Sequence, residues 1–251
     1  MRYRIAIPTL LSTLNLFSGF CGIFFVFVFE GEEKFMYAVS AIWVGCFFDL
    51  LDGAVARYLD AMSDFGKELD SMADSLSFGL LPACFFYQFF SEQSFSSSFS
   101  SLFLLLLSFF LLSGTVFRLI RFNLSASKSH TFQGLPSPAH AIWISSLVFM
   151  PPWGTDHVST PYLWLGIALF STLSMMLNLR FPSFKNIWIH VIGGENSRLL
   201  FRWTRGMLIL LLVGAMLYVL GGLCLFWGMI AYVAWTYLGW VQGKIRKTST
   251  L

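Results

Sequence analysis

Apolar runs long enough to cross a lipid bilayer follow one another along almost the whole chain, with only short polar segments between them. A span needs about 20 mostly apolar helical residues, and in lipid the backbone polar groups must be satisfied within the helix itself. Hydrophobic residues make up 57% of the 251 residues and charged residues only 12%, against about 25% charged residues in soluble domains. The sequence therefore predicts an all-α, polytopic integral membrane protein and excludes an ordinary water-soluble enzyme.

Hydropathy and helix breakers divide these runs into a predicted bundle of about eight transmembrane helices. The predicted spans are residues 8–29, 35–57, 68–90, 100–122, 138–154, 159–179, 206–220 and 222–241. Gly221 and Gly222 alone separate the last two, so this pair forms either two full spans or one broken hairpin.

The lysines and arginines test this topology. With the N-terminus in the cytoplasm, every one of them except Lys34 falls in a cytoplasmic segment. Cytoplasmic loops of membrane proteins are enriched in these residues, and Lys34 itself stands beside Glu32 and Glu33. We therefore expect both termini in the cytoplasm and a multi-pass protein of the cell (cytoplasmic or inner) membrane.

Cysteines and histidines form no metal-ligand or disulfide pattern. The cysteines stand singly in apolar runs and are expected to be buried: Cys21, Cys46, Cys84 and Cys224. The histidines are expected in loops or at the membrane interface: His130, His140, His157 and His190. The abundant phenylalanine and tryptophan suit lipid-facing and interfacial positions, so no nucleic-acid partner is expected.

Four aspartates fall in a fixed pattern on two predicted spans that meet at a short cytoplasmic turn. Asp49 and Asp52 lie near the end of the second span, and Asp70 and Asp74 lie near the start of the third. At about 100° of rotation per residue, each pair occupies one face of its helix. The small residues that share these faces are Gly53, Ala56 and Gly66. The two faces can close on each other just inside the membrane.

Such a cluster needs a counter-charge. An ionised aspartate within a span costs at least about 2.5 kcal/mol on insertion scales, and neighbouring carboxylates repel one another. Oxygen ligands suit hard divalent cations, and two such ions would form the arrangement that enzymes use for in-line phosphoryl displacement. The small residues leave room for a phosphate or a base beside the backbone.

Two other interpretations of the aspartates are open. They could cap helices at a wet interface, or they could line the cation or proton pathway of a transporter or channel. A pathway predicts acidic residues distributed through the membrane depth, and the spans beyond the third carry almost none. The sequence therefore favours a shared metal site over both alternatives.

The run from Asp49 to Asp74 has the form D-x2-D-G-x2-A-R-x8-G-x3-D-x3-D, with every position filled. It resembles the signature of the CDP-alcohol phosphotransferases, which are integral membrane enzymes of phospholipid synthesis. Further segments resemble the bacterial phosphatidylserine synthase branch of that family. These segments are residues 68–79 with Pro82, 118–123, 132–138 and 181–185.

The resemblance implies transfer of the phosphatidyl group of CDP-diacylglycerol to an alcohol, with release of CMP. It implies that two divalent cations, Mg²⁺ or Mn²⁺, are held by Asp49, Asp52, Asp70 and Asp74. Asp74 would also act as the general base that takes the proton of the attacking hydroxyl. The residues that would contact the CDP moiety are Gly53, Ala56, Arg57 and Gly66.

The resemblance also divides the chain and suggests its partners. Residues 1–187 would form the phosphotransferase membrane domain with its catalytic motif at 49–74, and residues 188–251 a basic cytoplasmic loop plus a C-terminal two-helix hairpin. The branch points to L-serine as the acceptor, and the family suggests a homodimer among membrane lipids. Other acceptors stay open, namely glycerol 3-phosphate, inositol phosphate or choline, as does a cation-binding transporter or channel.

Three residues outside the motif are candidates for binding the acceptor or a lipid phosphate. Ser77 shares the helix sector of Asp70 and Asp74, although a hydroxyl on a packed helix is more often buried and bonded to the backbone. Arg118 and Arg121 lie at the predicted cytoplasmic end of the fourth span. Either arginine could grip the serine carboxylate in bidentate fashion or simply anchor that end of the span.

Overall fold

The computed structural model of this chain is all-helical in the residues that it describes, which are 2–61, 63–92, 101–125, 134–149 and 160–176. The predicted spans at 206–220 and 222–241, and with them the proposed unit 188–251, lie outside the described residues.

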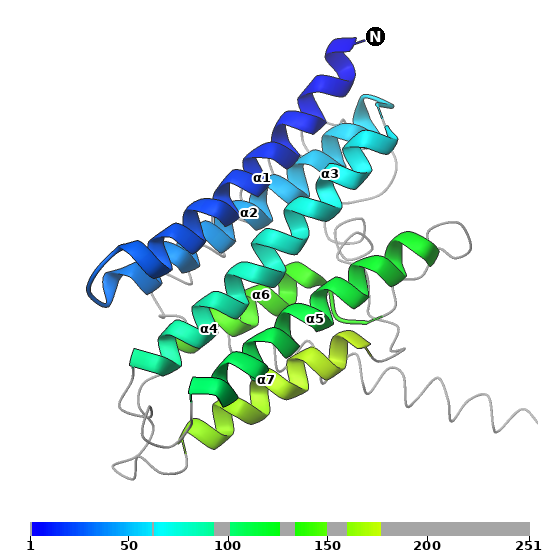
Figure 1. Ribbon diagram of the computed structural model, residues 1–251. Helices are drawn as coiled ribbons and strands as arrows, with labels where there is room; N and C mark the ends of the chain where they lie inside the picture. The colour runs from blue at the N-terminus through cyan, green and yellow to red at the C-terminus, as the bar shows by residue number, and fades with distance from the viewer. Residues whose placement is uncertain (1, 62, 93–100, 126–133, 150–159, 177–251) are drawn as a thin grey trace, which may run out of the picture.

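The first six predicted spans each coincide with a helical segment (Figure 1). Two long helices open the chain, α1 (Arg2–Val28) and α2 (Glu33–Tyr58). The third span combines α3 (Asp64–Ser75), a π-helical turn η1 (Leu76–Leu80) and α4 (Leu81–Glu92). The rest are α5 (Ser101–Ser125), α6 (Ser137–Ser145) with the 3₁₀ turn η3 (Ser146–Phe149), and α7 (Thr160–Met176).

Among the described residues, three helices are long and apolar enough to cross a membrane. They are Ala6–Val28, Glu33–Ala56 and Ser101–Leu124, and Leu165–Met176 is a shorter apolar helix. The composition and these helices make the chain a membrane protein.

Local sequence signals explain where the shorter helices begin. Ser63 is extended and its hydroxyl accepts a hydrogen bond from the Gly66 amide over 3.0 Å, which caps the start of α3. Asp64 in the first turn complements the positive end of the helix dipole. Pro136 precedes α6 and a second proline lies in its first turn, where the missing amide proton costs nothing.

The helices form one bundle in which α1 packs along α2, α3, η1 and α4. Helix α5 packs against α4 and α7, and α6 contacts α2, η1, α4 and α7, which places it in the middle of the bundle (Figure 1). The N-terminus, the α2–α3 turn and the C-terminal ends of α5 and α7 lie towards the same end of the bundle. These are the ends that the sequence assigns to one side of the membrane.

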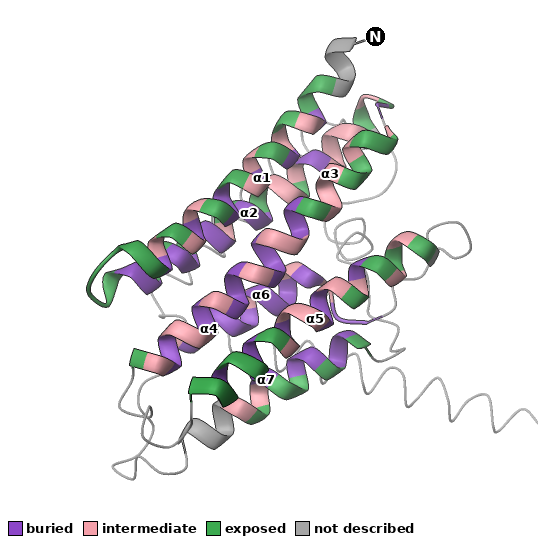
Figure 2. Ribbon diagram, viewed as in Figure 1, coloured by how far each residue is buried: buried purple, intermediate pink, exposed green. Residues whose placement is uncertain are grey.

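The pattern of buried and exposed side chains suits surrounding lipid rather than water. Phe78, Phe85 and Ile144 are fully buried between the helices. Phe17 on α1 and Phe109 on α5 are 61% and 64% exposed on the outside, and Figure 2 shows the exposed residues along the outer sides of α1 and α5. Large exposed apolar faces are rare on soluble monomers but suit a hydrocarbon environment.

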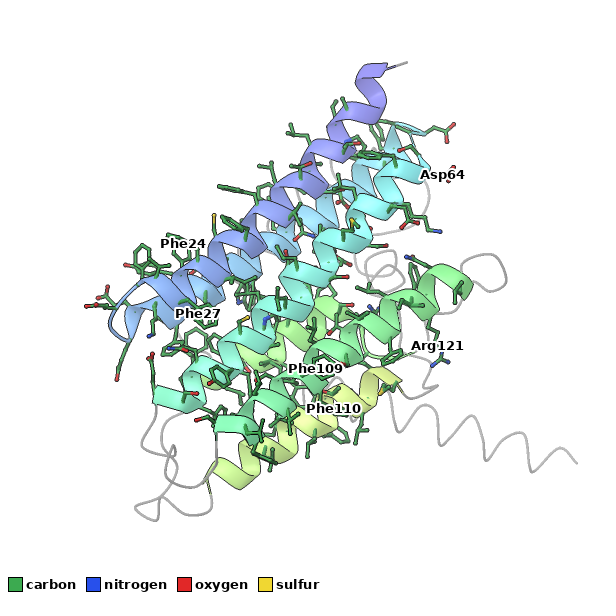
Figure 3. The ribbon with its side chains drawn as sticks, in the orientation of Figure 1. Phe24, Phe27, Asp64, Phe109, Phe110 and Arg121 are labelled. Atoms are coloured by element: carbon green, nitrogen blue, oxygen red, sulfur yellow. The ribbon has the colours of Figure 1, made fainter. Side chains whose placement is uncertain are left out.

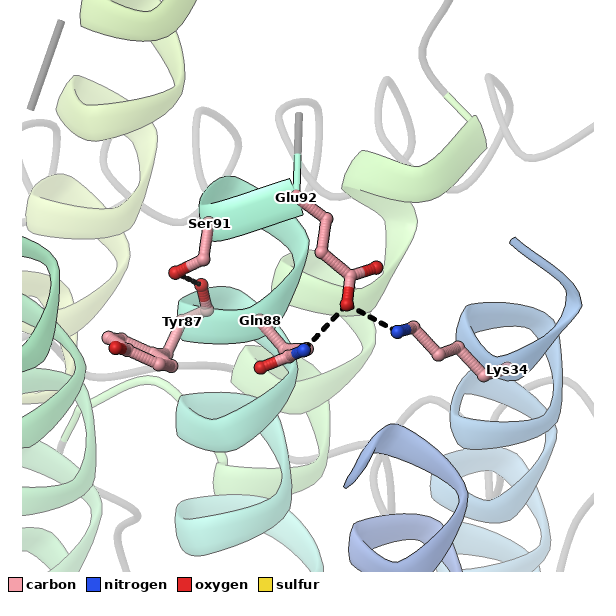
Figure 4. A network of polar contacts seen from close by, with 5 residues as sticks. All are labelled: Lys34, Tyr87, Gln88, Ser91 and Glu92. Atoms are coloured by element: carbon pink, nitrogen blue, oxygen red, sulfur yellow. Dashed lines mark hydrogen bonds and ion pairs between the residues drawn. The ribbon is translucent and has the colours of Figure 1, made fainter. Parts of the chain in front are cut away.

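A polar network ties α2 to α4 at the end of the bundle away from the α2–α3 turn (Figure 4). Lys34 forms an ion pair with Glu92, and Gln88 donates to the same carboxylate oxygen over 2.6 Å. The Lys34 side chain is only 7% exposed and its ammonium lies 5.2 Å from the centre of the Phe35 ring. Lys34, which the sequence predicts to lie on the outer side, therefore has both a carboxylate and an aromatic partner.

The expectation that His140 lies in a loop or at the membrane interface is wrong. His140 is 1% exposed within α6, and its Nδ1 lies 2.7 Å from the Ser171 hydroxyl on α7. The central position of α6 explains this burial. The other three histidines and Cys224 lie outside the described residues, whereas Cys21, Cys46 and Cys84 are free thiols.

Candidate active site

Three of the predicted aspartates converge where α2 meets α3. One carboxylate oxygen from each of Asp49, Asp70 and Asp74 lies within 4.8 Å of the other two. A hard cation holds its oxygen ligands at about 2.0–2.6 Å, so one ion bridges oxygens that are up to about 5 Å apart. The three carboxylates are therefore close enough to share an ion.

Asp52 lies beside this group and is held from a different helix. It is 5% exposed, and its Oδ2 accepts a hydrogen bond from the Ser12 hydroxyl of α1 over 2.7 Å. Its charge acts on the Asp70 carboxyl. All four predicted aspartates are thus in one neighbourhood, three of them in the tightest group.

The chemistry of the donor set fits a divalent cation. Every group in the cluster is a carboxylate, and the charges of Asp49, Asp52 and Asp70 all act on Asp74. Asp70 Oδ1 is buried and has no hydrogen-bond partner in the described part of the chain. A buried acceptor without a donor, surrounded by like charges, fits a hard divalent cation as its partner.

The small residues of the motif line the adjoining surface. Gly53 and Ala56 are half-buried on the last turns of α2, next to Asp52. Gly66 lies in the first turn of α3, where its amide donates to the capping Ser63 hydroxyl. The side chain of Arg57 lies outside what the structure describes.

The two candidate arginines of α5 have different surroundings. Arg118 donates a hydrogen bond from Nη1 to the Ser137 hydroxyl of α6, and its charge acts on the Asp74 carboxyl. Arg121 donates from Nη1 to the Met176 carbonyl at the end of α7 over 3.2 Å, and Figure 3 shows it near the end of α5. The fold brings Arg118 towards the aspartates and Arg121 towards the C-terminal end of α7.

The Ser77 hydroxyl is hydrogen-bonded to the backbone of helix α1. Its side chain is fully buried, and its hydroxyl donates to the Asn15 carbonyl of α1 over 2.9 Å. Ser77 lies in the π-helical turn that begins at Leu76. The hydroxyl joins η1 to α1.

Sequence reasoning missed the contribution of α1. Asn15 is fully buried, and its Nδ2 donates to Asp74 Oδ1 over 3.3 Å. Asn15 and Ser12 stand at the i, i+3 spacing that puts both side chains on one face of this mostly apolar helix. This spacing was the available signal. A further missed contact joins α5 to α3, where the Asn123 amide donates to the Ser71 hydroxyl over 2.9 Å.

Comparison with known proteins places this arrangement in a family. Residues 5–180 match the CDP-alcohol phosphatidyltransferase family. This match covers more than half of the chain and contains the whole aspartate motif, and the chain belongs to that family.

The chain is also similar to individual proteins of named activity. The chain is 30% identical over 185 residues to the CDP-diacylglycerol–serine O-phosphatidyltransferase of Helicobacter pylori, an alignment that covers 72% of this chain and 73% of that protein. It is 32% identical over 195 residues to the enzyme of the same name from Methanocaldococcus jannaschii, covering 77% of this chain and 82% of that protein. It is also 35% identical over 144 residues to the archaetidylserine synthase of Methanothermobacter thermautotrophicus, covering 57% of each chain.

Proposed function

We propose that this protein transfers the phosphatidyl group of CDP-diacylglycerol to the hydroxyl of L-serine, giving phosphatidylserine and CMP. The observation that carries the proposal is the convergence of Asp49, Asp70 and Asp74 within a chain of the CDP-alcohol phosphatidyltransferase family. The names of the relatives support serine as the acceptor, because all three comparisons above are with serine-lipid synthases.

The aspartates are proposed to hold two divalent cations, Mg²⁺ or Mn²⁺, with Asp49, Asp52, Asp70 and Asp74 as the ligands. When bound, such ions offset the charge of the pyrophosphate and of the departing CMP. The close grouping of the carboxylates and the unpartnered Asp70 oxygen support this assignment.

The CDP moiety is proposed to lie along the end of α2 and the start of α3. Gly53, Ala56 and Gly66 have no bulky side chain, so a phosphate or the cytosine can approach the backbone there. Arg57, one turn beyond Gly53, would add a guanidinium for the pyrophosphate. Its place in the motif supports this role.

Asp74 is proposed to be the general base. A base has to lie within hydrogen-bond reach of the hydroxyl that it deprotonates, and Asp74 sits at the inner side of the cluster, where it is only 9% exposed. The serine hydroxyl would give its proton to the Asp74 carboxylate as the oxygen attacks phosphorus, and the bond from phosphorus to the CMP oxygen would break on the opposite side. The chain's task is largely to align these groups.

Arg118 is proposed to bind the serine carboxylate. Its guanidinium already donates to Ser137 and acts electrostatically on Asp74, which places a cation close to the proposed base. A guanidinium has five donors in a planar fork, a geometry that matches the two oxygens of a carboxylate. For Arg121, the bond to the Met176 carbonyl supports an anchoring role instead.

The proposal extends to the protein in its membrane. We expect about eight spans from the hydropathy of the chain. From the distribution of lysine and arginine we expect cytoplasmic termini, an active site open to the cytoplasm and a location in the cell membrane. The common end shared by the N-terminus, the α2–α3 turn and the ends of α5 and α7 supports this orientation (Figure 1). A membrane domain over 1–187, a separate unit at 188–251 and a homodimer complete the proposal.

The test is CMP release by the purified protein with CDP-diacylglycerol, Mg²⁺ or Mn²⁺, and a panel of single alcohols. The panel holds L-serine, glycerol 3-phosphate, inositol phosphate and choline. We expect release with L-serine and formation of phosphatidylserine. Release with another alcohol alone would keep the chemistry and replace the acceptor, and no release with any alcohol would overturn the enzymatic function in favour of a cation-binding role.

A further inference from the structure

Helix α1 lies outside the aspartate motif, yet it sends a polar side chain into the centre of the cluster. Asn15 is 0% exposed on a mostly apolar helix. Burying a primary amide in such surroundings is unfavourable unless the amide is hydrogen-bonded. The partner of the Asn15 side chain therefore indicates why an amide is present.

That partner is the proposed general base. Asn15 Nδ2 donates to Asp74 Oδ1 over 3.3 Å, slightly longer than the usual N–H···O distance. Since a carboxylate only accepts hydrogen bonds, the nitrogen has to face Asp74. Asn15 Oδ1 is buried and has no hydrogen-bond partner among the described residues, so Asp74 alone orients this amide there.

The position of the amide is fixed by the packing of α1 on η1. The Ser77 hydroxyl donates to the Asn15 carbonyl over 2.9 Å. A Cβ at Gly19 would lie 2.4 Å from Ser77 Oγ and 2.9 Å from Ser77 Cα, so the helices approach this closely only with glycine there. On the other side, a Cβ at Gly45 would lie 3.0 Å from Asn15 Oδ1. The side chain is thus enclosed between α2 and η1 and aimed at Asp74.

We propose that Asn15 is a positioning residue for the phosphatidyl transfer. It holds Oδ1 of Asp74 and so sets the plane of that carboxylate, which leaves Oδ2 directed to the cation or to the acceptor hydroxyl. The inference rests on the proposed function, since it takes Asp74 as the group that accepts the proton. A packing role alone would be met by leucine, which has a similar size and buries no unpartnered oxygen.

The experiment compares Asn15→Leu and Asn15→Ala with Ser18→Ala in the full-length protein. Ser18 is the matched control because it is on the same helix, is 7% exposed and donates to the Ala41 carbonyl over 2.7 Å, without contact to an aspartate. Partners that orient metal ligands typically contribute 10–100-fold to activity or metal affinity. We expect kcat for CMP release to fall by about that factor in both Asn15 variants, with the KM for CDP-diacylglycerol unchanged, and Ser18→Ala to keep wild-type kinetics.

Two readouts separate positioning from folding. The thermal midpoint in detergent without metal reports folding, and the Mn²⁺ concentration at half-maximal stabilisation reports the site. The inference is supported if the Asn15 variants need more Mn²⁺ for half-maximal stabilisation while their metal-free thermal midpoints equal that of Ser18→Ala. Wild-type kcat and Mn²⁺ requirement in either Asn15 variant would overturn it. If kcat falls only in proportion to the metal-free thermal midpoint, with an unchanged Mn²⁺ requirement, Asn15 has a packing role and the inference is overturned as well.

Failure of the proposed function has a different signature. If the wild-type protein releases no CMP with any alcohol, the enzymatic proposal fails and Asn15 can have no role in catalysis. Wild-type activity together with unaffected Asn15 variants leaves the enzyme standing and removes only the positioning role.

Discussion

The Ser12 hydroxyl lies 2.7 Å from Oδ2 of Asp52 and donates a hydrogen bond to it from a neighbouring helix. The aspartates of α2 and α3 are therefore not oriented by their own helices alone. Helix α1 holds one carboxylate of each pair, Asp52 through Ser12 and Asp74 through Asn15. The functional unit is a three-helix arrangement, of which the sequence motif names two helices.

Replacing Ser12 by alanine should weaken the site without unfolding it. The bond to Asp52 is lost, and outer partners of metal ligands typically contribute 10–100-fold, so we expect a drop in CMP release near the lower end of that range at limiting Mn²⁺. Thr13→Ala is the control, because the Thr13 hydroxyl is exposed and donates only to the Thr9 carbonyl of its own helix. Equal activities of the two variants over a Mn²⁺ titration would contradict the assignment.

Asp74→Asn should abolish turnover and leave CDP-diacylglycerol binding largely intact. A positioned general base typically contributes about 10²–10⁴-fold, and asparagine keeps the shape of the side chain but cannot take the proton. CMP release and equilibrium binding of the donor lipid are measured on the same purified variant. Asp64→Asn, at an exposed position in the first turn of α3, controls for loss of a carboxylate on this helix. Near-normal turnover of Asp74→Asn would remove the base assignment.

Removal of divalent cations should both stop CMP release and lower thermal stability. A ligand that binds only the folded protein adds about 2.7 kcal/mol at a concentration 100 times its Kd, and the ions also relieve repulsion between the clustered carboxylates. We expect chelation to lower the midpoint in detergent and Mg²⁺ or Mn²⁺ to restore it. The combined variant Asp49→Asn with Asp70→Asn should show no such response. If Mg²⁺ or Mn²⁺ raised the thermal midpoint of this variant as much as that of the wild type, the ion would bind elsewhere.

Arg118→Lys and Arg121→Lys should separate the two arginines. Lysine keeps the charge but loses the planar fork that binds a carboxylate in bidentate fashion. Hydrogen bonds to charged groups contribute about 1.5–3 kcal/mol, so the KM for serine should rise at least about tenfold in Arg118→Lys. Arg121 is bonded to the Met176 carbonyl, and its variant should keep the wild-type KM. Unchanged serine affinity in both would end the acceptor assignment.

Gly19→Ala should destabilise the protein. The added Cβ would lie 2.9 Å from the Ser77 backbone, so α1 has to move away from η1, and overpacking of this kind costs about 1–3 kcal/mol. Gly166→Ala on α7 is the matched control, since nothing lies within 4 Å of the added atom and alanine favours the helix by up to about 1 kcal/mol. Thermal unfolding in detergent should therefore move in opposite directions. A midpoint of Gly19→Ala at or above wild type would show that the close approach is dispensable.

Most of the features that the sequence could predict follow from the apolar runs and from the spacing of the aspartates. Helix ends follow from local signals such as the capping Ser63 and Pro136, and the convergence of Asp49 with Asp70 follows from helical periodicity across a short turn. The prediction for His140 was wrong because burial inside a bundle depends on which helix takes the central place. Nothing in the residues around His140 indicates that α6 does so.

Contacts between helices that are distant in sequence could not be predicted in the same way. Asn15 and Ser12 are two of several polar residues in a mostly apolar run, and their partners are set by the rotation of α1 about its axis. The glycine at position 19 fixes that rotation, but its meaning becomes visible only when Ser77 lies against it. Helical periodicity likewise does not locate the π-helical turn in which Ser77 lies.

Because of the π-helical turn at Leu76–Leu80, the direction in which Asp70 and Asp74 face depends on the number of residues in the span, not only on their side chains. A π turn holds one residue more than an α turn, and one residue corresponds to about 100° of rotation. Deleting one residue there would make the span a regular helix, so Asp70 and Asp74 would swing away from α2 while Phe85 and Phe86 kept their packing. Every amino acid of the motif would still be present in such a variant, yet the carboxylates would no longer meet.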